Sequence, residues 1–270
     1  MNKHYKIGFI GCGKMASAII KGVLSTGFLA ENEILAAEIS EDNALKVKNA
    51  LNIEVTTDNG ILARNCDVIV IATKPCYVEE VLSEIASELT CEKLIVSIAA
   101  GVSINKIENI VGENRVVRVM PNTPALVLEG MSGVCKGTFA KDGDIEFVMN
   151  LLSKIGKCIE VSEDKIDIVT AISGSGPAFF YKIIEEIARA GEKLGLDYEK
   201  SLLLATQTAI GSAKMIENRG EVEVQTLVNN VATKGGCTFV GVSVMNEQKS
   251  DELFFDVIDK TTQKACELGK

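Results

Sequence analysis

A glycine-rich segment near the start of the chain has the residue types and spacing that hold a pyrophosphate. Residues 11–16 follow the pattern G-x-G-x-x-A, directly after an apolar run at residues 6–10. In this pattern Gly11 permits a tight turn, Gly13 lets the backbone approach the pyrophosphate, and Ala16 lets the following helix pack closely. The helix N-terminus then faces the phosphates. The alternative is an ordinary glycine turn. The residues expected to contact a dinucleotide here are Gly11, Cys12, Gly13, Lys14 and Met15.

An acidic residue stands at the end of the next expected strand. Glu38 follows the apolar residues 34–37 and lies 22 residues after Ala16. A carboxylate at this place can accept a hydrogen bond from the ribose 2′-hydroxyl, and it repels a 2′-phosphate. Glu38 therefore favours NADH over NADPH. The preference stays open, because Lys14 and Lys74 can still meet a phosphate and because Glu38 can equally be an exposed acid at a strand end.

The scarcity of histidine limits what the side chains can do alone. His4 is the single histidine, which excludes hydrolases that depend on a Ser-His or Cys-His pair. The eight cysteines include no C-x-x-C pair, so we expect reduced, mostly buried thiols and no metal site. We therefore expect a bound cofactor, and not a side chain, to carry the reactive group.

The composition narrows the classes of partner. Hydrophobic residues make up 47% of the 270 residues, which excludes a disordered chain. The net charge is −9 with no basic stripe, so a nucleic-acid partner is not expected. No apolar run approaches the ~20 residues of a membrane span. The first ten residues are too short in their apolar part for a signal peptide, so we expect a cytoplasmic protein.

Strand-like and helix-like segments alternate over the first 160 residues, which predicts a parallel sheet with right-handed crossovers. The run at residues 67–72 is typical of a strand buried on both faces. The expected strands are residues 6–10, 34–37, 67–72, 94–98, 115–120, 131–135 and 158–161. The expected helices between them are residues 15–24, 43–51, 78–89, 103–110 and 145–155.

The pattern changes near Glu163, after which only helical spacing is clear. One helix is expected at residues 177–194, and a second runs from an N-cap at Asp197 to about Asn218. This second helix is apolar nearly all round, which predicts burial in a core or between subunits. We therefore expect one domain at residues 1–162 and a helical domain at residues 163–270. Further helices are expected at residues 223–231, 238–246 and 251–268.

Several motifs together resemble the pyrroline-5-carboxylate reductase family, which carries out the last step of proline biosynthesis. The motifs occur in the family's order and spread over nearly the whole chain. They are GFIGCGxM at residues 8–15, ATKP at 72–75, VSIAAGV at 96–102, RVMPNTPA at 118–125, SGSGPA at 173–178, GSAKM at 211–215 and GGCT at 235–238.

The resemblance implies an α/β fold, in which an N-terminal Rossmann domain is followed by an all-α dimerisation domain. It also implies a homodimer or a larger ring of dimers, and NAD(P)H as the cofactor. Further cofactor contacts implied by the family are Asn59, Ala72, Thr73, Lys74, Pro75, Ala99, Ala100 and Gly101. Substrate contacts implied by the family are Glu163, Asn230, Gly235, Gly236, Cys237 and Thr238.

The reaction implied is hydride transfer to the imine carbon of pyrroline-5-carboxylate, which gives L-proline. The backbone N–H groups of residues 235–237 are expected to hold the substrate carboxylate. Thr238 is expected to bind the ring nitrogen; its alternative role is a helix N-cap. Glu163 is alternatively a solvated hinge residue, and Lys74 a surface lysine. Lys234 departs from the family, which usually has proline there.

Three other functions are considered. A β-hydroxyacid dehydrogenase has a catalytic lysine on a helix after a glycine-rich segment, with an asparagine one turn later. Here Lys182 follows Gly176 by six residues and the asparagine is missing, which disfavours this class. A non-catalytic dinucleotide-binding regulatory protein and a reductase of a related cyclic imine stay open, because Lys234 alters the expected substrate loop.

Overall fold

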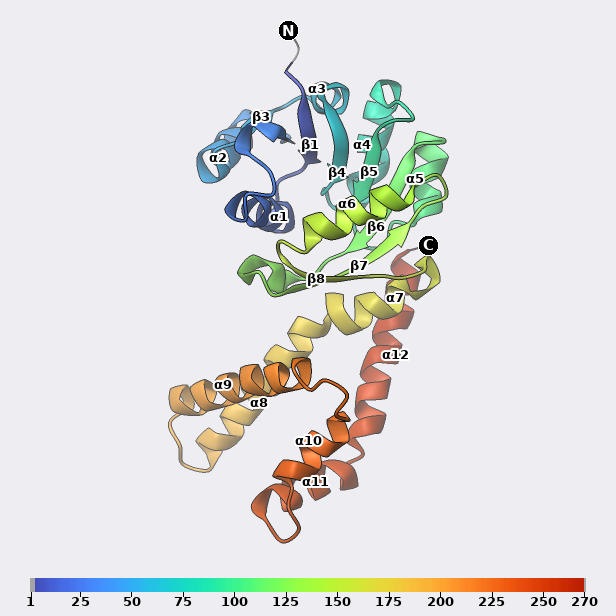
Figure 1. Ribbon diagram of the computed structural model, residues 1–270. Coiled ribbons are helices and arrows are strands. Elements are labelled where there is room, and N and C mark those ends of the chain that lie inside the picture. The colour runs from blue at the N-terminus through green and yellow to red at the C-terminus, as the bar shows by residue number, and fades with distance from the viewer. Residues whose placement is uncertain (1–2, 270) are drawn as a thin grey trace. The chain divides into compact units, whose positions relative to one another are not determined.

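The computed structural model describes residues 3–269, so the expected domain limits at residues 1 and 270 lie outside the described residues. The chain divides into two compact units (Figure 1). The first unit runs to Ser175 and takes in the chain again from Thr261, and the second comprises Gly176–Lys260. Residues 163–175 and the C-terminal segment thus group with the sheet.

The first unit is built on one sheet of eight strands in the order β3-β2-β1-β4-β5-β6-β7-β8. The strand order reverses at β1, which pairs with β2 on one side and with β4 on the other, parallel to both. The strands are β1 Tyr5–Ile10, β2 Ile34–Ala37, β3 Glu54–Thr56, β4 Cys66–Ile71, β5 Leu94–Ser97, β6 Arg115–Met120, β7 Gly130–Lys136 and β8 Gly156–Glu160.

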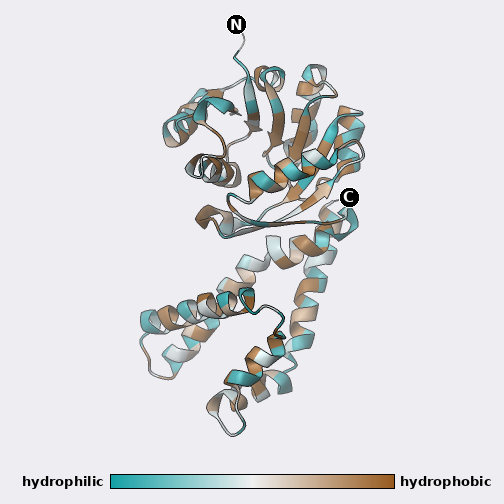
Figure 2. Ribbon diagram, in the orientation of Figure 1, coloured by the Kyte–Doolittle hydropathy of each residue, from teal (hydrophilic) through white to brown (hydrophobic). Residues whose placement is uncertain are grey.

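Each face of the sheet is covered by helices and has its own apolar core. Ile7 and Phe9 of β1 point into a core shared with α1 and α6, and both are fully buried. Ile69 of β4 points into the opposite core, which includes Leu62 of α3 and Leu82 of α4. Figure 2 accordingly shows the strands as hydrophobic along most of their length. The helices are α1 Lys14–Ser25, α2 Glu41–Leu51, α3 Asn59–Asn65, α4 Val78–Ile85, α5 Ile104–Val111, α6 Asp142–Leu152 and α7 Ile166–Val169.

The predicted parallel pairing holds for the other strand pairs, but β7 pairs antiparallel with β6. A parallel pair needs a long crossover, usually a helix. The connection from Met120 to Gly130 is short and contains only the 3₁₀ turn Thr123–Val127, so the chain turns back beside β6. The longer connection through α6 then makes β8 parallel to β7.

The sequence patterns did not predict β3, α3 or the four-residue helix α7, and one expectation about cysteine was wrong. The strand β3 has three residues at the sheet edge, too few to show a period, and α3 follows it directly. Only three of the eight thiols are buried, because several lie on loops or on exposed helix faces. The exposed thiols are Cys76, Cys91, Cys237 and Cys266.

The second unit is helical, and between Glu163 and Gly269 the described chain contains only helices and turns. The Asp197 side chain caps α9 by accepting a hydrogen bond from the Lys200 N–H at 3.1 Å, which confirms that prediction. In the single chain, however, Leu203 and Leu204 of α9 are 69% and 60% exposed. The helices are α8 Gly176–Lys193, α9 Tyr198–Glu217, α10 Val224–Val231, α11 Cys237–Glu247 and α12 Ser250–Leu268, the last of which extends into the first unit.

The close approach of α3 to β1 depends on Gly8. A Cβ atom at Gly8 would lie 2.5 Å from Leu62 Cδ2 and 2.7 Å from Cys66 Sγ, and both of these residues are fully buried. We expect Gly8→Ala to lower the free energy of unfolding by about 1–3 kcal/mol, since the core must shift to admit the methyl group. Urea denaturation followed by circular dichroism measures this change.

The matched control is Gly143→Ala in α6. No described atom lies within 4 Å of a Cβ atom at Gly143, so alanine is expected to stabilise the helix by up to about 1 kcal/mol. Equal denaturation midpoints for the Gly8→Ala variant and the unchanged protein would contradict the packing argument.

Candidate active site

Four loops meet at the carboxyl edge of the sheet because the strands that precede them are parallel. Residues 11–13 follow β1, Glu38 follows β2, residues 72–75 follow β4 and residues 99–101 follow β5. The reversal of strand order between β1 and β4 lies in the middle of this group. In open α/β sheets this is the place where ligands bind.

Gly11 occupies a position that excludes a side chain. Its backbone has φ +87°, and its N–H donates to the Ala37 carbonyl oxygen at 2.9 Å. A Cβ atom there would lie 3.1 Å from the Ala72 carbonyl oxygen. The ends of β1, β2 and β4 therefore meet at Gly11, whose positive φ agrees with the tight turn expected there.

Glu38 reaches back to the glycine-rich loop. Its Oε1 accepts a hydrogen bond from the Cys12 backbone N–H at 2.7 Å. The charge-assisted bond ties the end of β2 to the loop after β1. Burial raises the pKa of the Cys12 thiol to about 12, and the Glu38 carboxylate adds to the shift. The thiol is therefore protonated at neutral pH.

The residues at this edge fit a dinucleotide. Gly13 is the N-cap of α1, and no described side chain caps that helix, so its first N–H groups remain available to a phosphate. No described atom lies within 4 Å of the place that a Gly13 Cβ atom would take. Beside Gly11, the buried Thr73 hydroxyl has no hydrogen-bond partner among residues 3–269. An orphaned buried hydroxyl at this position is consistent with a ligand contact.

Four other residues were expected to contact the cofactor, and their side chains lie in different surroundings from those of the glycine-rich loop. The Asn59 side chain, at the start of α3, donates to Glu84 Oε2 at 2.8 Å. Lys14 and Lys74 are exposed, whereas Met15 packs partly against the core. Their contacts with a nucleotide stay predictions.

The expected substrate loop in the second unit is a tight turn leading into α11. The Gly236 N–H donates to the Thr233 carbonyl oxygen at 2.9 Å, and Gly235 has φ +84°. A bond from residue i+3 to residue i with a positive φ at i+2 is typical of a type II turn, which places Lys234 at i+1. The turn thus forms with lysine at a position where proline is favoured.

The alternative role of Thr238 as a helix N-cap was wrong. Gly236 is the N-cap, and Cys237 is the first residue of α11. Thr238 therefore lies in the first turn, where it is half-buried, and Cys237 is exposed. Asn230 lies near the end of α10 and is exposed.

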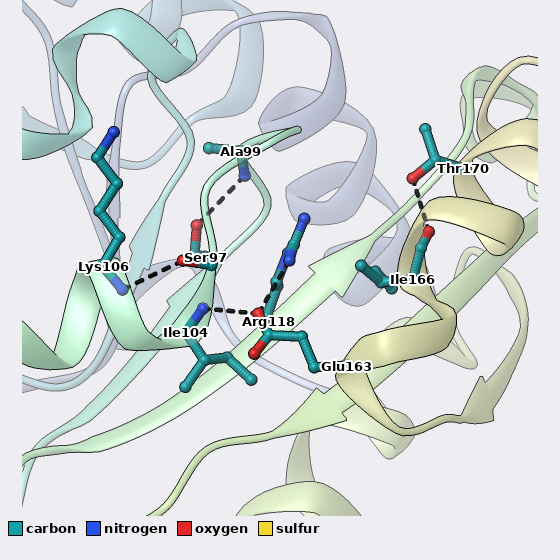
Figure 3. A network of polar contacts seen from close by, with 9 residues as sticks. Ser97, Ala99, Ile104, Lys106, Arg118, Glu163, Ile166 and Thr170 are labelled. Carbon is teal, nitrogen blue, oxygen red and sulfur yellow. Dashed lines mark hydrogen bonds and ion pairs between the residues drawn. The ribbon is translucent and has the colours of Figure 1, made fainter. Parts of the chain in front are cut away.

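Glu163 makes two charge-assisted contacts in the first unit (Figure 3). Its Oε1 accepts from the Ile104 N–H at 2.7 Å and from Arg118 Nη1 at 2.9 Å. The Arg118 side chain is 7% exposed and that of Glu163 is 33% exposed. No role for Arg118 was predicted from the sequence. Its signature is a charge inside the otherwise apolar run at residues 116–120.

Comparison with known proteins identifies the family. Residues 163–268 match the family described as pyrroline-5-carboxylate reductase dimerisation. Over 99% of both chains, the protein is 37% identical to the pyrroline-5-carboxylate reductase of Methanosarcina acetivorans. The chain belongs to the pyrroline-5-carboxylate reductase family. Family members are NAD(P)-dependent oxidoreductases that act on a C=N bond.

Solved structures of the family agree with this membership. A pyrroline-5-carboxylate reductase from Coxiella burnetii is 35% identical, with a TM-score of 0.93 over 98% of this chain and 99% of that one. The Plasmodium falciparum pyrroline carboxylate reductase, with NADP bound, is 34% identical, with a TM-score of 0.87 over all of both chains. Residues 6–101 also match the family described as NADP oxidoreductase coenzyme F420-dependent.

The β-hydroxyacid dehydrogenases share only the fold. A Mycobacterium tuberculosis 3-hydroxyisobutyrate dehydrogenase is 13% identical, with a TM-score of 0.51 over 72% of this chain and 67% of that one.

Among residues 3–269, none of the helices combines the length and apolar character that crossing a membrane requires.

Cys12 and Cys237 are expected to differ in reactivity because only one of them is accessible. With a pKa of about 12, the Cys12 thiol has almost no thiolate at pH 8, and it is buried. We expect iodoacetamide to modify Cys237 at least about a hundredfold faster than Cys12. Peptide mass spectrometry of the native protein measures both rates. Equal modification rates at the two cysteines in the native protein would contradict the burial of Cys12. The control is the protein unfolded in urea, in which the two rates should become similar.

Proposed function

We propose that this protein reduces pyrroline-5-carboxylate to L-proline. The observation that carries the proposal is full-length similarity to reductases of this name, together with an intact glycine-rich loop at the strand-order reversal. Reduced nicotinamide supplies the hydride that reduces the imine carbon. The protein's own residues need to bind, orient and polarise the substrate, which a chain with one histidine can do.

The proposed cofactor site comprises the four loops at the carboxyl edge of the sheet. Gly11 and Gly13 admit the pyrophosphate to the backbone, and the first N–H groups of α1 bind it. The hydroxyl of Thr73 and the loop at residues 99–101 line the remainder. The orphaned state of Thr73 Oγ1 among the described residues supports this assignment.

The proposed substrate site is the loop that leads into α11. The N–H groups of Gly235 and Cys237 hold the substrate carboxylate at the positive end of an eleven-residue helix. The Gly236 N–H, which was also expected to contribute, instead donates to the Thr233 carbonyl oxygen and so holds the turn. The Thr238 hydroxyl donates to or accepts from the ring nitrogen and so orients the imine carbon. A protonated imine accepts hydride more readily, and solvent supplies the proton. Lys234 adds a positive charge beside the carboxylate.

The cofactor preferred by this protein is NADH. Glu38 stands where a 2′-phosphate would lie, and Glu41 and Asp42 follow it in the first turn of α2. Residues 37–42 contain no lysine or arginine to offset these charges. A dianionic 2′-phosphate is disfavoured next to three carboxylates.

The proposed assembly is a homodimer or a larger ring of dimers built through the helical unit. Leu203, Leu204 and Phe255 are among many large apolar side chains exposed in the single chain. A monomeric protein rarely exposes so much apolar surface, and association would cover it.

The first experiment measures the absorbance of reduced nicotinamide after mixing with pyrroline-5-carboxylate, once with NADH and once with NADPH. We expect rapid loss of absorbance with proline as the product.

Thr238→Val removes the hydroxyl of the side chain but keeps its shape. This change should lower kcat about tenfold to a hundredfold without changing nucleotide affinity. Absence of turnover despite nucleotide binding would instead favour a related imine or a non-catalytic role, and Lys234→Pro would then be tested first.

Glu38→Ala tests the cofactor preference. Removing the charge should raise the ratio of NADPH to NADH use, measured as kcat/KM, by about tenfold. Glu38→Gln separates the two roles of the residue, because it keeps an oxygen for the Cys12 N–H but lacks the charge. Glu31→Ala is the control. It changes the net charge by the same amount as Glu38→Ala, but at the edge of the sheet opposite to the proposed cofactor site. An unchanged cofactor ratio in both Glu38 variants would exclude recognition of the ribose by Glu38.

A further inference from the structure

The loop between β5 and α5, residues 98–103, is held by two segments from far later in the chain. Glu163 bonds to the first residue of α5, and Leu268 lies against Gly101. These two residues are the first and last of the region that matches the dimerisation family. Both contacts lie within the first compact unit.

The first contact fixes the end of the loop. In Figure 3 the Glu163 carboxylate lies between the Ile104 N–H and the Arg118 guanidinium. Arg118 is buried on β6, an interior strand of the sheet, so its charge needs this partner. At the beginning of the loop, the Ala99 N–H donates to the Oγ of Ser97, the last residue of β5, at 3.4 Å. Glu163 therefore links the loop to the rigid sheet.

The second contact is between backbones. A Cβ atom at Gly101, whose φ is +72°, would lie 3.1 Å from the Leu268 carbonyl oxygen and 3.7 Å from the Gly269 nitrogen. In return, a Cβ atom at Gly269 would lie 3.5 Å from the Gly101 carbonyl oxygen. The absence of a side chain at Gly101 thus lets the last turn of α12 touch the middle of the loop. A Cβ atom at Gly101 would push the two segments apart by a few tenths of an ångström, whereas one at Gly269 would make ordinary van der Waals contact.

We propose that Glu163 and the last turn of α12 are positioning elements for the cofactor, acting through residues 99–101. The inference rests on the proposed function, which assigns this loop to the nucleotide. Neither segment needs to touch the cofactor. The two ends of the helical region hold the loop in its binding shape, so loss of either contact weakens nucleotide binding before it affects the chemistry.

The α12 contact is tested with a chain that ends at Glu267, with Gly101→Ala, and with both changes together. Nucleotide dissociation constants are measured by fluorescence titration of NADH without substrate. We expect the shortened chain and Gly101→Ala each to raise Kd about tenfold. The combined variant should resemble the shortened chain alone, because the same contact is lost in both.

The matched control is Gly27→Ala. Gly27 has φ +66°, and no described atom lies within 4 Å of its Cβ position. It therefore reproduces the backbone strain of Gly101→Ala without the steric contact. It should lower the thermal midpoint and leave Kd unchanged. If Gly101 acted only by touching the nucleotide, shortening the chain would leave Kd unchanged, and the combined variant would show the full effect of Gly101→Ala.

The Glu163 contact is tested with Glu163→Gln, which keeps an oxygen for the Ile104 N–H and removes the charge beside Arg118. We expect a Kd for NADH raised about threefold to tenfold in the absence of substrate. A direct substrate contact would instead raise the KM for pyrroline-5-carboxylate. Glu160→Gln, an exposed acid on β8, is the control.

The outcomes separate the two proposals. An unchanged Kd in the shortened chain and in Glu163→Gln, with normal binding by the unaltered protein, overturns the positioning role. Failure of the unaltered protein to bind either nucleotide overturns the proposed function instead. Circular dichroism identifies a variant that does not fold, and the remaining variants then decide the question.

Discussion

The crowding of backbone around Gly11 is the constraint on which the site depends. The N–H of Gly11 bonds to the end of β2, and its Cα faces the carbonyl group of Ala72 after β4. Only a residue without a side chain, in a left-handed conformation, fits between the two. Because β1 lies between β2 and β4 and is parallel to both, the loops after all three strands lie at one edge of the sheet. The close approach at Gly11 then packs these loops together beside the N-terminus of α1.

Two carboxylates then fix the loops that the strands present. Glu38 accepts a hydrogen bond from the Cys12 N–H, and Glu163 accepts one from the Ile104 N–H. Each carboxylate belongs to a different element from the amide that it binds. An unpaired backbone N–H is costly when buried, and a charged acceptor makes a strong hydrogen bond. Loops that lack regular structure therefore acquire a defined shape from distant acids.

The helical region carries more apolar surface than a single chain can cover. Leu203 and Phe255 are 69% and 70% exposed, although the interior of the sheet unit is densely apolar. Both side chains belong to residues 163–268, the region that matches the dimerisation family. The nearly all-apolar pattern of α9 was visible in the sequence, but the sequence left open whether a core or a second subunit covers it.

The features that depend on residues close together in the chain could be predicted from the sequence. Strand and helix periodicity, the glycine spacing at residues 11–16, the Asp197 cap and the lack of histidine chemistry all depend on residues a few positions apart. The family followed from motifs of the same kind.

Which distant segments meet could not be predicted from the sequence and is seen in the fold alone. The antiparallel direction of β7, the partner of Arg118 45 residues away, and the contact of Gly101 with the last turn of α12 have no local pattern. The same holds for Asn59, whose amide bonds to Glu84 on the neighbouring helix. Periodicity records which face of an element is apolar. Periodicity does not show which segment pairs with a strand edge, neutralises a buried charge or packs against a glycine. These partners depend on the packing of the whole chain, because many sequence separations satisfy the same local pattern.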